Sequence, residues 1–182
     1  MLPVKLRSVL IALLALVALG SIVFVAPKPI ASNDNAVAGD CSGSVNRLIV
    51  DFGSAAGLAP LDKCVSGFTG TAWELFAASR VQVIGTTEYP TGFACRIGGY
   101  PTQEEQPCTN TPDARTGYWA YYYATVSSEK PGASGNQWQF ATIGSSMRHP
   151  KCGDFEGWRF IEPGESAIEL KPRTTPKPIA CH

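Results

Sequence analysis

Short runs of β-prone residues, separated by clusters of Gly, Pro, Asn and Thr, make up most of the chain after residue 44. Alternating or continuous apolar runs of this length, bounded by turn residues, are typical of strands. The predicted strands are Val45–Phe52, Val81–Ile84, Phe93–Ile97, Tyr118–Val126, Trp138–Ile143 and Phe155–Ile161. We expect them to form a mostly antiparallel sheet.

The run from Tyr118 to Tyr123 carries large rings on both faces of its predicted strand. Because side chains alternate between the faces of a strand, Trp119, Tyr121 and Tyr123 share one face, and Tyr118 and Tyr122 share the other. A strand of this kind is either covered on both sides or presents one aromatic face to a partner. The run therefore favours a binding module.

One short helix is predicted after the first strand. Thr71 and Glu74 have the spacing of a capping box, in which the Thr hydroxyl and the Glu carboxylate satisfy free backbone amides. We expect the helix over Ala72–Ser79, packed on the sheet through Trp73 and Phe76, because a helix of this length needs such a partner. The predicted fold class is α+β, a mostly antiparallel sheet with one short helix.

The remaining segments lack a hydrophobic period. Gly53–Asp62 is expected to be a loop, and the Pro-rich tail from Pro163 is expected to be extended and exposed until Cys181. The chain is thereby divided into an N-terminal segment (1–38), a folded body (39–162) and a tail (163–182).

The N-terminal segment has the layout of a secretory signal. Lys5 and Arg7 precede an apolar run from Val9 to Ala26, and the small residues 36–38 offer a cleavage site. The run is also just long enough to span a bilayer, so a signal peptide and a retained membrane anchor both stay open. Either outcome predicts an extracellular or cell-surface protein that touches a membrane only through an uncleaved N-terminal helix.

Charge argues against nucleic acid as a partner. The chain has 15 basic and 15 acidic residues. Cleavage after Ala38 would remove three basic residues and one acidic residue, leaving a net charge of −2. Without a basic surplus, binding to a phosphate backbone is not expected.

All six cysteines follow residue 38, which predicts a disulfide framework. Cys95 and Cys108 flank a turn-rich segment whose two ends are expected to lie close together. Cys41 and Cys64 bracket the first strand and its loop, and Cys152 and Cys181 would tie the tail to the body. The predicted pairs are Cys95–Cys108, Cys41–Cys64 and Cys152–Cys181.

Motifs of enzymes and metal sites are absent from the sequence. No C-x-x-C pair is present, so neither a metal nor a cofactor is expected. The best acid–base set that can be assembled is His149 with Asp154 and Glu156. We expect the histidine to be exposed and both carboxylates to be solvated, so the sequence predicts a protein that is not an enzyme.

Aromatic residues are the positive signal for function. Most of them are expected to fill the core of a small disulfide domain, but one helix cannot cover both faces of the Tyr118 strand. We therefore expect a ligand-binding surface made of Tyr118, Tyr122, Trp138 and Trp158.

The order of the motifs resembles that of a known family. Asp51-Phe52 precedes the helix, and Gly92–Gly99, Gly117–Tyr122 and Gly153–Trp158 follow it. Over about residues 45–161 the chain resembles the small C-terminal domain of transcobalamin and intrinsic factor, especially exported actinobacterial relatives of that domain. The resemblance implies a β-grasp-like sheet with one helix on an exported accessory or ligand-capture protein. In the vitamin B12 carriers this domain closes over a corrinoid held by a helical barrel, which this chain does not have.

The expected function is that of an exported, non-enzymatic binding module for an unknown small ligand or surface protein. The alternative is a protein–protein interaction or inhibitor module that uses the constrained loop between Cys95 and Cys108.

Overall fold

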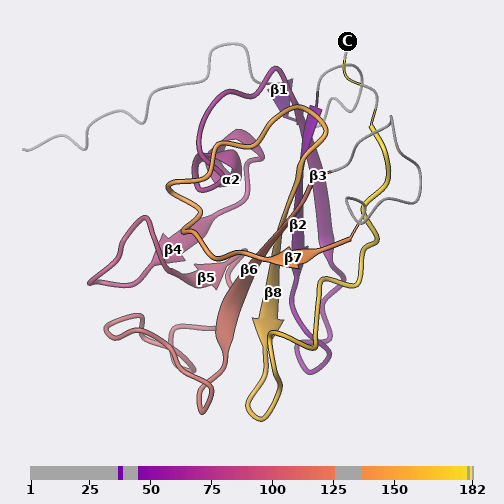
Figure 1. Cartoon of the computed structure of the whole chain (residues 1–182). Coiled ribbons are helices and arrows are strands. Elements are labelled where there is room, and N and C mark those ends of the chain that lie inside the picture. The colour runs from indigo at the N-terminus through magenta and orange to yellow at the C-terminus, as the bar shows by residue number, and fades with distance from the viewer. Residues whose placement is uncertain (1–36, 39–44, 126–136, 180, 182) are drawn as a thin grey trace, which may run out of the picture. The chain divides into compact units, whose positions relative to one another are not determined.

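The structure is a computed structural model, and it describes residues 37–38, 45–125, 137–179 and 181 of the 182-residue chain (Figure 1). Residues 1–36, which contain most of the predicted signal or anchor segment, lie outside the described residues. Within the described part, no helix has the length and apolarity that crossing a membrane requires.

Six strands form the main sheet, in the order β1-β3-β2-β8-β6-β7. They are β1 (Val37–Ala38), β2 (Val45–Asp51), β3 (Leu61–Ser66), β6 (Tyr118–Ala124), β7 (Gln139–Phe140) and β8 (Phe155–Ile161). The central strands β2 and β8 are parallel, and all other neighbours in this sheet are antiparallel. A separate antiparallel hairpin contains β4 (Val83–Gly85) and β5 (Ala94–Ile97).

The one described helix is α2 (Glu74–Ala78), which confirms the predicted α+β class. It is shorter than expected, because residues 72 and 73 form a turn that leads into it. The capping box is present: the Glu74 carboxylate accepts the Thr71 amide at 2.8 Å, and Thr71 Oγ1 accepts the Glu74 amide at 3.3 Å. The local signal therefore located the start of the helical segment, although not its length.

Strand β3 corrects the sequence prediction, which placed a loop up to Asp62 and no strand after it. It pairs with β2 from Val50↔Leu61 to Val45↔Ser66. Its burial follows no clean alternation, since Cys64 and Val65 are both buried while Asp62 and Lys63 are exposed. Pairing with β2, rather than its own hydrophobic pattern, defines this strand.

One core lies between the sheet and α2, on what we call the helix face. Phe76 of α2 is fully buried, and its ring lies 4.4 Å from the ring of Trp158. Trp119 and Phe160 extend this core towards Phe52 through edge-to-face contacts. The prediction that the helix packs through Phe76 is confirmed.

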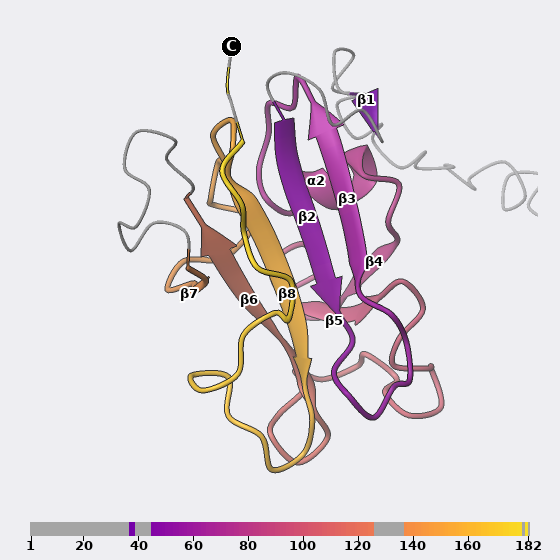
Figure 2. The same ribbon diagram turned by 90° about the vertical axis from the view of Figure 1, so that its right-hand side faces the viewer.

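A second core lies on the opposite face, which we call the tail face because the C-terminal tail covers it (Figure 2). Tyr122 is fully buried there, and its hydroxyl donates to the carbonyls of Ala167 and Leu170 at 2.7 and 2.6 Å. The indole of Trp138 donates to the Thr174 carbonyl at 2.7 Å. The expectation of an exposed tail is therefore only partly right: many tail side chains are exposed, but the tail also covers this face and supplies the second cover that the helix cannot.

Asp51 fixes the tail to the sheet. This fully buried carboxylate accepts Arg173 Nη2 at 2.6 Å, the Arg173 amide at 2.8 Å and Arg159 Nη1 at 3.2 Å. Burial alone raises the pKa of Asp51, but the bonds from Arg173 and Gly53 and the charge of Arg159 outweigh it and hold the pKa below its usual value. The group is therefore a structural anion.

Two of the predicted disulfides are present, Cys95–Cys108 and Cys152–Cys181. The second ties the end of the tail to the segment before β8. Cys64 is also disulfide-bonded, whereas Cys41 of the third predicted pair lies outside the described residues. Disulfides of this kind are typical of an oxidising compartment.

Candidate functional site

A groove of about 300 Å³ lies at the edge of β6, and we call it the edge groove. Three segments and Trp158 line it: Gly92–Ala94 before and within β5, Tyr118–Tyr121 of β6, and Phe140–Ser145 at the end of β7 and after it. None of the residues that line it carries a charged side chain. Phe140 and Ile143 stand at its rim with 47% and 49% of their surface exposed.

Aromatic stacking rigidifies part of the wall of the edge groove. The ring of Tyr121 stacks on Trp158, with the centroids 4.6 Å apart and the planes inclined by 25°. The Tyr121 hydroxyl donates to the buried carboxylate of Glu156. Two contacts therefore fix the orientation of this ring, one through its face and one through its hydroxyl.

Arg148 binds two buried carboxylates, those of Asp154 and Glu156, next to the Tyr121 ring. Its guanidinium donates to Glu156 at 2.9 Å and to Asp154 at 2.7 Å, and lies 4.1 Å from the centroid of the Tyr123 ring. Burial raises the pKa of Glu156 to about 7, against the lowering effect of Arg148 and Tyr121. Burial and the Glu156 charge raise the pKa of Tyr121, so the tyrosine hydroxyl remains protonated.

The segment after β7 is held by the turn that begins the helical region. The amide of Trp73 donates to the Ser145 carbonyl at 3.1 Å, and the amide of Ala72 donates to the Arg148 carbonyl at 2.8 Å. These bonds draw residues 141–148 away from β6 and towards α2. The groove is the space that this change of direction leaves beside β6.

The structure does not bring the four predicted ligand-binding residues together. Tyr118 is half-buried and lines the edge groove, as does Trp158, although Trp158 is buried on the helix face. Tyr122 is fully buried under the tail, and Trp138 lines a different hollow beside tail residues 171–176. An accessible Tyr122 was expected because the covering role of the tail was missed.

The expectation of solvated carboxylates at Asp154 and Glu156 is also wrong, because both are buried and bonded to Arg148. His149 is exposed, as expected. In the part of the chain that the structure describes, no group of three or more His, Cys, Asp or Glu residues could hold a metal ion. The position of Arg148 near two acidic residues was the one sequence signal for this network.

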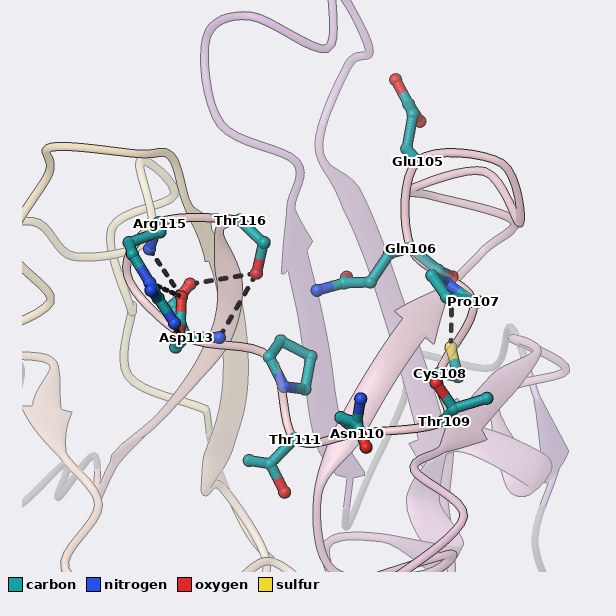
Figure 3. Close-up of a pocket in the computed structure, with 11 residues that line it drawn as sticks. Glu105, Gln106, Pro107, Cys108, Thr109, Asn110, Thr111, Asp113, Arg115 and Thr116 are labelled. Atoms are coloured by element: carbon teal, nitrogen blue, oxygen red, sulfur yellow. Dashed lines mark hydrogen bonds and ion pairs between the residues drawn. The ribbon is translucent and has the colours of Figure 1, made fainter.

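A third hollow, of about 280 Å³, lies inside the loop Glu105–Thr116, which begins within the segment closed by the Cys95–Cys108 disulfide. Figure 3 shows the Asp113–Arg115 ion pair and Cys108 on opposite sides of it. Arg96 braces the base of the loop by donating to the carbonyls of Pro101 and Gln106, both at 2.6 Å. The lining of this hollow is more polar than that of the edge groove.

Comparisons with protein-family models, with curated proteins and with solved structures find no match for this chain.

Proposed function

We propose that this protein is an exported, non-enzymatic binding module that captures an uncharged, mainly apolar ligand in the edge groove. The observation that carries the proposal is the lining of that groove, which combines six aromatic side chains with small residues and no charge. Small-ligand sites are typically concave and mostly apolar, with a few polar groups that fix orientation. A volume of about 300 Å³ suits a small ligand or a single large side chain of a partner.

The state of the buried carboxylates supports binding rather than catalysis. Asp51 is engaged by two arginines, and Asp154 and Glu156 share a third. A general acid or base must reach the substrate proton, and none of these three carboxylates lines the edge groove.

Export is supported by the disulfides and by the signal-like N-terminal segment. The β-grasp-like assignment is supported by the strand order. The two central strands, β2 and β8, are parallel; β3 lies beside β2, and β6 and then β7 lie beside β8. The resemblance to the small domain of the vitamin B12 carriers favours the same general role. In such an arrangement another chain would supply the rest of the ligand contacts.

A matched pair of charge substitutions tests the proposal. Ile143→Asp places a carboxylate at the rim of the edge groove, whereas Ile168→Asp places one on the tail, where Ile168 is 81% exposed and outside the groove. Both proteins should fold, because both positions are solvent-exposed. Uncharged aromatic and aliphatic compounds should raise the melting temperature of the wild type and of Ile168→Asp, and should have a much smaller effect on Ile143→Asp.

Mass spectrometry of the protein recovered from its native host would identify a co-purifying ligand and read the N-terminus at the same time. Equal responses of the two variants to every compound would contradict ligand capture in this groove.

A second candidate function rests on the loop Glu105–Thr116. Its base is fixed by the Cys95–Cys108 bond and by Arg96, while Arg115 at its outer part is exposed. A rigid exposed loop of this kind suits a protein partner or a protease. A trypsin assay separates the cases: an inhibitor would slow trypsin at stoichiometric concentration, and ordinary cleavage after Arg115 would count against inhibition of trypsin-like enzymes.

A further inference from the structure

Strand β6 has an unpaired edge inside the edge groove. Strand β7 pairs only with Tyr122 and Tyr123, and the last bond beyond it joins the Ala141 amide to the Tyr121 carbonyl at 3.0 Å. Along a strand, the N–H and C=O of every second residue point to the same edge. The amide and the carbonyl of Trp119 therefore point to the edge that β7 leaves free.

These main-chain groups have no recorded partner among the described residues. No backbone or side-chain hydrogen bond reaches the Trp119 amide or carbonyl from the loops around β6, although only 5% of the surface of Trp119 is exposed. The indole Nε1 of the same residue is also buried without a partner. Buried polar groups are nearly always hydrogen-bonded, so a partner is expected for these groups.

The unpaired groups lie where the groove is. Tyr118, Trp119, Ala120 and Tyr121 all line it, so a molecule that enters reaches the free edge of β6. An extended amino-acid residue presents its own N–H and C=O, from the two amides that flank it, with the spacing that a strand edge requires, as in the addition of a peptide strand to a sheet. A charged group would find no counter-charge among the lining residues.

We propose that the edge groove binds an extended amino-acid residue that is flanked by two amides and carries an apolar side chain. The N–H and C=O of this residue pair with the main chain of Trp119 as an added strand would, and its side chain lies against Phe93, Phe140 and Ile143. This inference rests on the proposed function and specifies the ligand chemistry for the same groove. An extended peptide and a small N-acylated amino-acid amide share that chemistry.

Three probes separate what the hydrogen-bonding amides and the apolar ring each contribute to binding. N-acetyl-phenylalanine N-methylamide carries both flanking amides and the ring. Its N-methylated phenylalanine analogue lacks the N–H that faces Trp119, and ethylbenzene carries the ring alone. Binding is measured by two-dimensional ¹H–¹⁵N NMR titration of the full chain. The backbone amide and the indole N–H of Trp119 are the reporters.

We expect the first probe to shift the Trp119 signals and to slow deuterium exchange of its backbone amide. The N-methylated analogue should bind about 3- to 10-fold more weakly, which corresponds to one net hydrogen bond. N-acetyl-Ala-Phe-Ala N-methylamide distinguishes the sources: tighter binding than the single residue favours a peptide, and no gain favours a small amide.

Equal affinity of the amide and its N-methylated analogue would overturn the inference. Binding of ethylbenzene in the groove, with no gain from the amide, would also overturn it while leaving the proposed function standing. If none of the probes binds, the inference and the proposed function both fail.

Discussion

Replacement of Arg173 by Met removes the main side-chain anchor of the tail and keeps an apolar stem of similar length. In the native protein the Arg173 guanidinium donates to Asp51 at 2.6 and 3.0 Å and to the Gly53 carbonyl at 3.0 Å. The loss of one partner of a buried ion pair costs about 3–5 kcal/mol. The loss should be smaller for this pair, because Arg173 is 46% exposed and Asp51 keeps its bond from Arg159.

We therefore expect Arg173→Met to lower the free energy of unfolding by about 2 kcal/mol. With a slope of about 2 kcal/mol per molar urea, the unfolding midpoint should fall by about 1 M. Hydrogen exchange should show the origin of the loss, because the β6 amides under the tail should exchange faster. The β4–β5 hairpin has no hydrogen bond to the described tail residues, so its amides should change less than those of β6.

The pH dependence follows from the direction of the Asp51 pKa shift. Because the folded state holds this pKa below its usual value, the stabilisation is present at neutral pH. It is lost as the pH falls through the folded pKa, where the carboxylate is protonated. The difference between wild type and Arg173→Met should therefore shrink in acid.

Two further variants make the test decisive. Arg115→Met breaks an exposed Arg–Asp pair by the same substitution and should not change stability measurably. In an Asp51→Asn background, Arg173→Met should cost less than half of its effect in the wild type. A full-sized effect in that background, or an unchanged urea midpoint in the wild-type background, would refute the anchoring argument.

Two other predictions follow from buried groups. Burial raises the pKa of Glu156 to about 7, so its contribution to stability is fully present below its unfolded pKa and is lost as the pH rises towards 7. In Glu156→Gln the urea midpoint should change less between pH 5 and 8 than it does in the wild type. The same pH dependence in both proteins would contradict this. A Cβ at Gly157 would lie 2.6 Å from the Trp138 ring, so Gly157→Ala should cost about 1–3 kcal/mol in thermal or urea unfolding. Gly144→Ala, whose Cβ meets nothing closer than 3.8 Å, is the control and should be nearly neutral.

The parts of the fold that sequence predicted well are those in which local signals and burial agree. Strand β8 has the predicted bounds, because all of its residues from Phe155 to Ile161 are buried between two covers. The capping box and the Cys95–Cys108 pair, whose cysteines are 13 residues apart, were also local signals. Strand β7 is shorter than the predicted Trp138–Ile143, because the chain after Ala141 turns to bond with the segment before α2.

The tail shows what local pattern cannot supply. Its prolines favour an extended backbone without internal hydrogen bonds, which suggested exposure. Such a backbone can still pack, and Ala167, Pro172 and Pro176 are buried. The partners are distant in sequence: Asp51 and Arg173 are 122 residues apart. An acidic residue between Val50 and Phe52 in a buried strand was the available hint that a cation had to come from elsewhere.

The same interactions explain why the hollow lies at the edge of β6 rather than on either of its faces. The helix face is closed by α2, and the tail face is closed by the tail, so both aromatic sets of β6 are used in cores. If β7 had continued along β6, it would have paired with Trp119 and filled the groove. It stops because Ser145 and Arg148 give their carbonyls to amides that precede α2. One change of chain direction thus creates the hollow, leaves the Trp119 main chain unpaired and places Arg148 on Glu156. The free strand edge is therefore built into the fold by specific contacts, which is the reason for proposing that it has an occupant.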